Sequence, residues 1–91
     1  MLYAVWNPIP NYNGRALSKA GWGRTPLCLA SSADEGKTWS APRVIEGEED
    51  HGYCYPALMF TRDDALLAAY CAGGPADGAC LARLTIRKLA L

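Results

Sequence analysis

Two side chains stand out for the chemistry they could do, Arg24 and Tyr55. A planar guanidinium can hold a carboxylate through two parallel charge-assisted hydrogen bonds, so Arg24 is a candidate anion-binding residue. Trp22, two positions earlier, could stack on a sugar ring or pack over the end of a sheet. The alternative for Arg24 is a solvated cation at the end of a loop. The alternative for Tyr55 is a core or rim tyrosine whose hydroxyl is hydrogen-bonded.

Few other side chains could supply acid–base, metal or redox chemistry. We interpret the acidic segment Glu48–Asp50 as a solvated loop, with a catalytic base as the alternative, and His51 as a surface residue. No C-x-x-C pair is present and His51 is the one histidine, so we expect no metal site. No cofactor is expected either. Four cysteines lie in apolar, strand-like runs, where a free thiol behaves as a small buried hydrophobe: Cys28, Cys54, Cys71 and Cys80. A Cys71–Cys80 bridge across a hairpin is the alternative.

Five residues in the spacing S-x-D-x-G-x-T-W predict a tight β-hairpin turn: Ser32, Asp34, Gly36, Thr38 and Trp39. Asp34 can accept hydrogen bonds from backbone N–H groups one or two residues further on. Gly36 can adopt the positive φ that a tight hairpin requires. We expect Trp39 to begin the next strand and to lay its ring across the turn.

This motif resembles the Asp-box, the repeat signature (BNR repeat) of sialidases and related β-propellers. The resemblance extends over roughly Arg24 to Arg87, through Gly23–Ser32, Tyr53–Leu58 and Asp63–Leu66. Sialidase-type propellers carry an arginine shortly before the final box, a tyrosine about thirty residues later, and then an Asp-Gly turn before an apolar strand. Here the Asp-Gly turn is replaced by Asp63-Asp64.

The resemblance implies roles for the two residues named first. Arg24 falls on the position of one member of the arginine triad that clamps the substrate carboxylate. Tyr55 falls on the position of the nucleophile, with Tyr53 as the alternative. The carboxylate on the anomeric carbon of sialic acid would repel an anionic Asp or Glu nucleophile, and a neutral phenol that a neighbouring Glu deprotonates as it attacks avoids this repulsion. The family's other two arginines, its acid/base Asp and its Glu have no counterpart here. A lone tyrosine and a lone arginine cannot assemble acid, nucleophile and clamp.

We therefore expect a fragment of a sialidase-like glycoside hydrolase propeller that is inactive by itself. The alternative is a small self-associating β module that binds an acidic carbohydrate or a protein partner. The fold class expected is all-β, with antiparallel sheets that form about one and a half to two blades of a six-bladed propeller. The chain would be one partial propeller unit over 1–91, with incomplete blades at 1–46 and 53–91.

Six strands are expected, separated by turn-forming segments: Leu2–Trp6, Pro26–Ser31, Thr38–Glu46, Tyr53–Thr61, Ala65–Ala72 and Ala79–Leu89. A long loop runs from Asn7 to about Arg24. Ala65–Ala72 is nearly all apolar, so it is expected to be buried on both faces. Incomplete blades leave exposed strand edges, which predict a homo-oligomer.

Charge and hydropathy exclude several classes of protein. Nine basic and nine acidic residues give a formal net charge of zero. This balance argues against binding to nucleic acid or to an anionic membrane surface. No apolar run approaches the ~20 residues that span a bilayer. The segment Met1–Trp6 reads directly into a strand and lacks the features of a signal peptide, so a cytoplasmic location is expected if Met1 is the true start.

Overall fold

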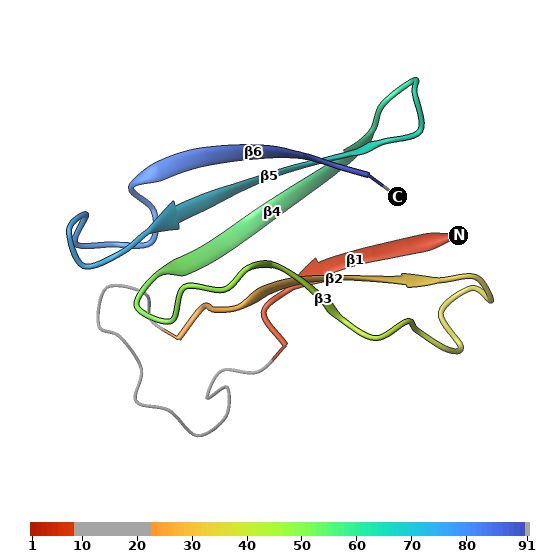
Figure 1. The fold of residues 1–91 in the computed structure, drawn as a ribbon, viewed down its shortest axis with the longest axis horizontal. Coiled ribbons are helices and arrows are strands. Elements are labelled where there is room, and N and C mark those ends of the chain that lie inside the picture. Colours follow the sequence, from red (N-terminus) through yellow and green to blue (C-terminus); the bar gives the residue numbers. More distant parts are fainter. Residues whose placement is uncertain (9–22, 91) are drawn as a thin grey trace.

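The computed structural model describes residues 1–8 and 23–90 of the chain, which form two three-stranded antiparallel sheets (Figure 1). Trp22 and most of the expected Asn7–Arg24 loop lie outside the described residues. The described residues contain no helix, so no helix that could cross a membrane is present in that part of the chain. The expectation of an all-β antiparallel protein is confirmed.

Each sheet is built from three strands that are consecutive in the chain. Sheet A has the order β1-β2-β3, from Leu2–Trp6, Leu27–Ser32 and Arg43–Glu46. Sheet B has the order β4-β5-β6, from Gly52–Phe60, Leu66–Gly73 and Arg83–Leu89. All six strands appear where the sequence predicts them, within a few residues. The strands β1 and β3 are the edges of sheet A, and β4 and β6 are the edges of sheet B.

Two strand boundaries differ from the prediction. The third strand begins at Arg43 and not at Thr38, because Pro42 has no N–H to donate to the ladder. Before that proline, the Ser40 N–H still donates to the Ser31 carbonyl oxygen of β2 at 2.8 Å. The sixth strand begins at Arg83 and not at Ala79. Residues 79–82 belong to the connection between β5 and β6, and this change matters for the site below.

The hydrophobic core lies between the two sheets. Leu27 and Leu29 of β2 and Ile45 of β3 pack against alternate residues of β5. Cys28 and Ala30 of β2 take no part in this cluster, because alternate side chains of a strand point to opposite faces.

Strand β5 is not buried on both faces, contrary to the prediction. Leu66, Ala68 and Tyr70 are buried, whereas Leu67 and Ala69 between them are partly exposed. The first set faces sheet A across the core. The second set faces outward, where no described segment covers the sheet completely. An all-apolar strand in this fold therefore has one buried face and one that is only partly covered.

A polar network ties the two sheets together at the edge of the core. The Tyr70 hydroxyl donates to Glu46 Oε2 at 2.6 Å, which joins β5 to β3. Arg87 of β6 donates from Nη1 to the Ile45 carbonyl oxygen at 2.6 Å, and Nη1 lies 3.6 Å from Glu46 Oε1. Burial, together with the bond to Glu46, raises the pKa of Tyr70 above its usual value. Tyr70 is therefore a neutral donor at the inter-sheet contact.

Candidate functional site

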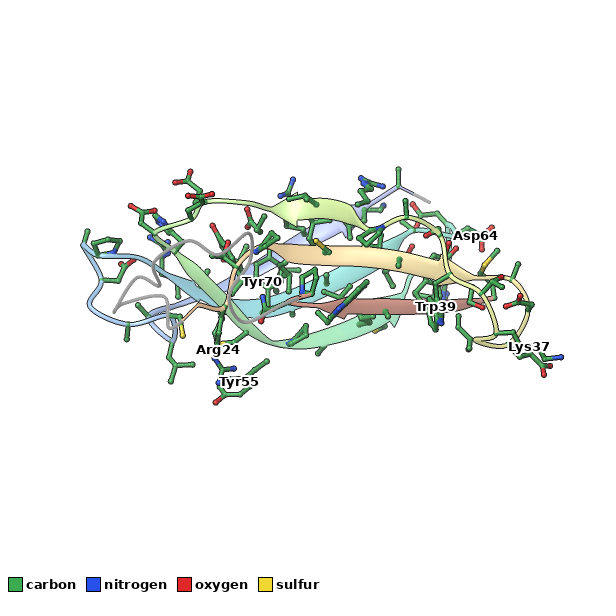
Figure 2. All side chains as sticks on the ribbon, turned by 90° about the horizontal axis from the view of Figure 1, so that it is seen from below. Arg24, Lys37, Trp39, Tyr55, Asp64 and Tyr70 are labelled. Atoms are coloured by element: carbon green, nitrogen blue, oxygen red, sulfur yellow. The ribbon has the colours of Figure 1, made fainter. Side chains whose placement is uncertain are left out.

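The structure brings Arg24 and Tyr55 together, although 31 positions of sequence separate them. The guanidinium carbon of Arg24 lies 5.4 Å from the centroid of the Tyr55 ring, within the range of a cation–π contact. Figure 2 shows both side chains on the same side of the molecule, away from the end that carries Trp39 and Lys37. The two candidate residues singled out from the sequence thus form one site.

Backbone contacts between the sheets position Arg24. The Arg24 carbonyl oxygen accepts a hydrogen bond from the Tyr53 N–H of β4 at 2.7 Å. The next residue, Thr25, is buried and donates its hydroxyl proton to the Glu48 carbonyl oxygen at 2.9 Å. These bonds attach the segment that leads into β2 to the start of β4 and to the loop before it. The exposed Arg24 side chain therefore extends from a fixed backbone.

A β-bulge positions Tyr55. Cys54 pairs with Cys71 and Ala57 with Ala69, so β4 carries one residue more than β5 between these pairs. Tyr55 lies in this bulge with φ 54, a left-handed conformation that residues with a large side chain rarely adopt. Pro56 follows and cannot donate to the ladder, which is typical of a proline at a bulge. The bulge turns the Tyr55 side chain outward, where it is 65% exposed.

The same bulge separates Tyr55 from Tyr53. In a regular strand residues two apart share a face, so Tyr53 and Tyr55 would point the same way. Here Tyr53 is 4% exposed and packs edge-to-face on Tyr70, with ring centroids 6.2 Å apart. Burial raises the pKa of Tyr53 to about 12, and the Glu46 carboxylate adds to this shift. Tyr53 is a core residue, so of the two tyrosines only Tyr55 can meet a ligand.

A cavity of about 400 Å³ opens beside the Arg24–Tyr55 pair. The cavity is lined by charged, aromatic, thiol and apolar side chains: Arg24, Cys54, Tyr55, Ala79, Cys80 and Leu81. Within the described part of the chain, no carboxylate lines this cavity and none is paired with the Arg24 guanidinium. The site can hold an anion and offer an aromatic face, but the described residues supply no carboxyl group there for proton transfer.

Three lining residues come from the connection between β5 and β6 and were not predicted from the sequence. We expected Ala79, Cys80 and Leu81 to lie inside the sixth strand. No local signal marks them as cavity residues. Only the late start of β6 at Arg83 leaves them free to fold over the start of β4.

The Asp-box residues form a closed hydrogen-bonded turn between β2 and β3. Thr38 donates to Asp34 from its N–H at 2.8 Å and from its hydroxyl at 2.5 Å. The Ser32 hydroxyl donates to Asp34 Oδ1 at 2.8 Å and accepts from the Gly36 N–H at 2.8 Å. These bonds, above all the one from the Thr38 hydroxyl, lower the pKa of Asp34 to about 2. The carboxylate is occupied within the turn, and its role is structural.

The geometry of this turn agrees with the sequence in part. Gly36 has φ 91, as predicted. Asp34 accepts from the N–H of Thr38, four residues on, and not from the N–H groups directly after it. Trp39 does not begin a strand, but its indole Nε1 donates to the Gly36 carbonyl oxygen at 3.1 Å. The ring crosses the turn as expected and remains 46% exposed.

The acidic loop before β4 forms a cluster at the surface. His51 Nδ1 lies 2.6 Å from Asp50 Oδ1 and 3.7 Å from Glu48 Oε2. Donor atoms of the three residues lie within 4.8 Å of one another, close enough to contact one cation. The Asp50 and Glu48 side chains are 60% and 69% exposed, which is typical of a solvated acidic loop. His51 is only partly exposed, because its ring stacks on Tyr53.

All four thiols are free in the structure. Cys28, Cys54 and Cys80 are buried, as predicted, and Cys71 is partly exposed. The Cys71–Cys80 bridge considered as an alternative is not formed. The closest thiols belong instead to Cys54 and Cys80, with Sγ atoms 3.7 Å apart.

Comparisons of the chain with known protein families, with curated proteins and with solved structures find no match. The likeness to sialidase-type propellers therefore stays a prediction that rests on the motif residues themselves. The chemical character of the Arg24–Tyr55 cavity does not depend on that likeness, since it follows from which side chains line the cavity.

Proposed function

We propose that the chain is a unit of a sialidase-like β-propeller, and that its Arg24–Tyr55 cavity binds a carboxylate-bearing sugar without cleaving it. The observation that supports this proposal is the Arg24 guanidinium. It has no carboxylate partner among the described residues and lies against the Tyr55 ring at a cavity of about 400 Å³. A guanidinium binds a carboxylate through paired hydrogen bonds, while an aromatic face packs against the apolar side of a sugar ring.

Binding without cleavage follows from the groups that the cavity lacks. Glycoside hydrolysis requires a proton donor for the leaving group, and a tyrosine nucleophile requires a base. Over residues 1–8 and 23–90, the cavity lining contains neither an aspartate nor a glutamate. In this proposal Arg24 fixes the carboxylate, Tyr55 packs against the ring, and Leu81 closes the apolar side of the cavity.

Titration with N-acetylneuraminic acid tests the binding proposal directly. We expect chemical-shift changes or heat that report a dissociation constant on the order of 1 mM, as for a small ligand with few contacts. Arg24→Ala should weaken this affinity at least about tenfold, because a charge-assisted hydrogen bond contributes about 1.5–3 kcal/mol. Arg62→Ala, which removes an exposed arginine from the turn between β4 and β5, should leave the affinity unchanged.

The methyl ester of the same sugar separates recognition of the carboxylate from general sugar binding. The ester should bind no better to the wild-type protein than the free acid binds to Arg24→Ala. Equal affinity for ester and acid, or the absence of any response at millimolar ligand, would contradict the proposal. An aryl sialoside supplies the readout for cleavage. Release of the aryl group that disappears in Tyr55→Phe would show an active enzyme instead.

Self-association is a second candidate function, supported by an uncovered apolar face. Cross-strand pairing places Leu84 and Ile86 of β6 beside Cys71 and Ala69 of β5, on the face of sheet B opposite the core. Leu84 and Ile86 are 71% and 61% exposed. Contiguous apolar patches of this kind are rare on monomeric proteins.

The chain also carries a surface that could receive this face. An apolar groove of about 380 Å³ lies on sheet A, with Trp6, Trp39 and Pro42 in its lining. We infer that sheet B of one copy packs on this groove of a second copy, which is a head-to-tail contact.

Sedimentation velocity at micromolar protein should show a dimer or a larger species. Ile86→Lys should shift the distribution to monomer, because it places a charge in the apolar contact. Ala76→Lys, in the exposed turn before β6, is the matched control and should leave the distribution unchanged. A wild-type protein that remains monomeric would exclude self-association. Association that persists in Ile86→Lys would indicate pairing along the free strand edges.

A further inference from the structure

Two buried thiols meet at the base of the cavity. Cys54 lies in β4 directly before the bulge, and Cys80 lies in the connection between β5 and β6. Their Sγ atoms are 3.7 Å apart, and the side chains are 2% and 5% exposed. Both residues line the cavity of about 400 Å³, so a small molecule can reach the sulfur atoms from that side.

We propose that Cys54 and Cys80 are a redox-sensitive pair that hydrogen peroxide converts to a reversible disulfide. A disulfide has an S–S length of about 2.05 Å, so the two sulfur atoms must approach by less than 2 Å. Cys80 sits in the turn between β5 and β6, outside the sheet ladders, so no strand pairing opposes this approach. A disulfide between Cys54 and Cys71 is less favourable. Cys71 is opposite Cys54 in the sheet, but no contact joins their sulfur atoms in the described structure.

The reaction needs one peroxide for each pair of thiols. The Cys80 thiolate attacks one oxygen of hydrogen peroxide, the O–O bond breaks, and the hydroxide released takes up a proton to form water. The resulting sulfenic acid is then attacked by the Cys54 sulfur, which loses its proton as the S–S bond forms and a second water leaves. The two sulfur atoms give up two electrons in total, and the peroxide accepts both.

The order of these steps follows from the environment of Cys54. Burial raises the pKa of the Cys54 thiol to about 11, and contact with Cys80 adds to this effect. A thiol attacks peroxide as its thiolate, so Cys54 is poorly suited to the first step. Peroxide is also small enough to enter the cavity, whereas the buried sulfur atoms are hard to reach for a bulky disulfide reagent.

The bond would fix one wall of the cavity. It links β4, at the residue before Tyr55, to the turn that supplies Ala79 and Leu81. It also closes a loop between positions 26 apart, which restricts the unfolded chain. We therefore expect the oxidised protein to melt roughly 10 °C higher than the reduced protein. This expectation holds whatever ligand the cavity takes.

Intact-mass measurement of the purified, fully reduced protein after equimolar peroxide is the first test. We expect a mass loss of about 2 Da, a fall from four thiols to two when they are titrated in the unfolded protein, and full reversal by dithiothreitol. Digestion with trypsin, followed by a protease that cleaves on the N-terminal side of aspartate, places the three cysteines of this region on separate peptides. Cys54 falls in 50–62, Cys71 in 64–76 and Cys80 in 77–83, so the linked peptides identify the pair.

Matched variants distinguish this pair from the other thiols. Cys28→Ser and Cys71→Ser should still lose 2 Da in about the same yield, whereas Cys80→Ser should not. The wild-type digest keeps the inference testable even if a variant folds poorly. A link between Cys54 and Cys71, a link between two copies, or four thiols that remain after peroxide would each overturn the proposal.

Discussion

Replacing Tyr70 with alanine is expected to lower the free energy of unfolding by about 3–5 kcal/mol, the usual cost of removing a buried aromatic ring. Tyr70 is 1% exposed and belongs to the core cluster between the sheets. Its ring packs edge-to-face on Tyr53, and its hydroxyl donates to Glu46 across the sheet boundary. The substitution therefore removes both apolar packing and an inter-sheet hydrogen bond. Urea denaturation followed by circular dichroism measures the change.

Tyr70→Phe divides this loss into its two parts. The ring stays and only the bond to Glu46 is removed, so we expect a smaller loss of about 1.5 kcal/mol. Tyr55→Ala is the matched control, because the same residue type is 65% exposed there, and it should change stability by no more than about 0.5 kcal/mol. A loss below about 1 kcal/mol for Tyr70→Ala would mean that the inter-sheet core does not hold the fold together.

The parts of the fold that depend on local sequence could be predicted. Alternating apolar residues and turn formers located six strands, because strand periodicity and turn chemistry act over a few residues. The spacing of the Asp-box residues gave the turn at Gly36. At the turn between β4 and β5, Asp64 has φ 59, a conformation that aspartate tolerates better than most residues. The turn therefore forms although Asp63-Asp64 stands where sialidase-type propellers carry Asp-Gly.

The site depends on features that act at longer range. Arg24 and Tyr55 were both named from the sequence, but whether they meet depends on how sheet A packs on sheet B. The bulge that separates Tyr55 from Tyr53 is a property of the register between β4 and β5, which a single strand does not reveal. The contact between Cys54 and Cys80 likewise arises only when the turn before β6 folds back over β4.

In the turn between β5 and β6, the backbone of Ala79 lies close against Gly73, the last residue of β5. A Cβ added at Gly73 would lie 1.9 Å from the Ala79 carbonyl oxygen, far inside contact distance. The obstacle is backbone, so it cannot rotate away. The whole segment that carries Ala79 and Cys80 must shift to make room for a methyl group. Gly73 therefore fixes the position of the cavity wall as well as the end of the strand.

Gly73→Ala is accordingly expected to destabilise the protein by about 3 kcal/mol, at the upper end of the usual cost of overpacking. Gly74→Ala is the matched control at the next position. There the added Cβ would meet the His51 ring at 2.7 Å, a side chain that can turn toward solvent, so a loss of about 1 kcal/mol is expected. Urea denaturation of the two variants measures the difference.

The same pair of variants connects the fold to the thiol chemistry. Because Gly73→Ala displaces Cys80, the yield of the peroxide-induced link to Cys54 should fall, while Gly74→Ala should retain it. Equal stability and equal yield in both variants would show that the turn adapts freely to the added methyl group. In that case the approach of Ala79 to β5 would not be what sets the geometry of the cavity.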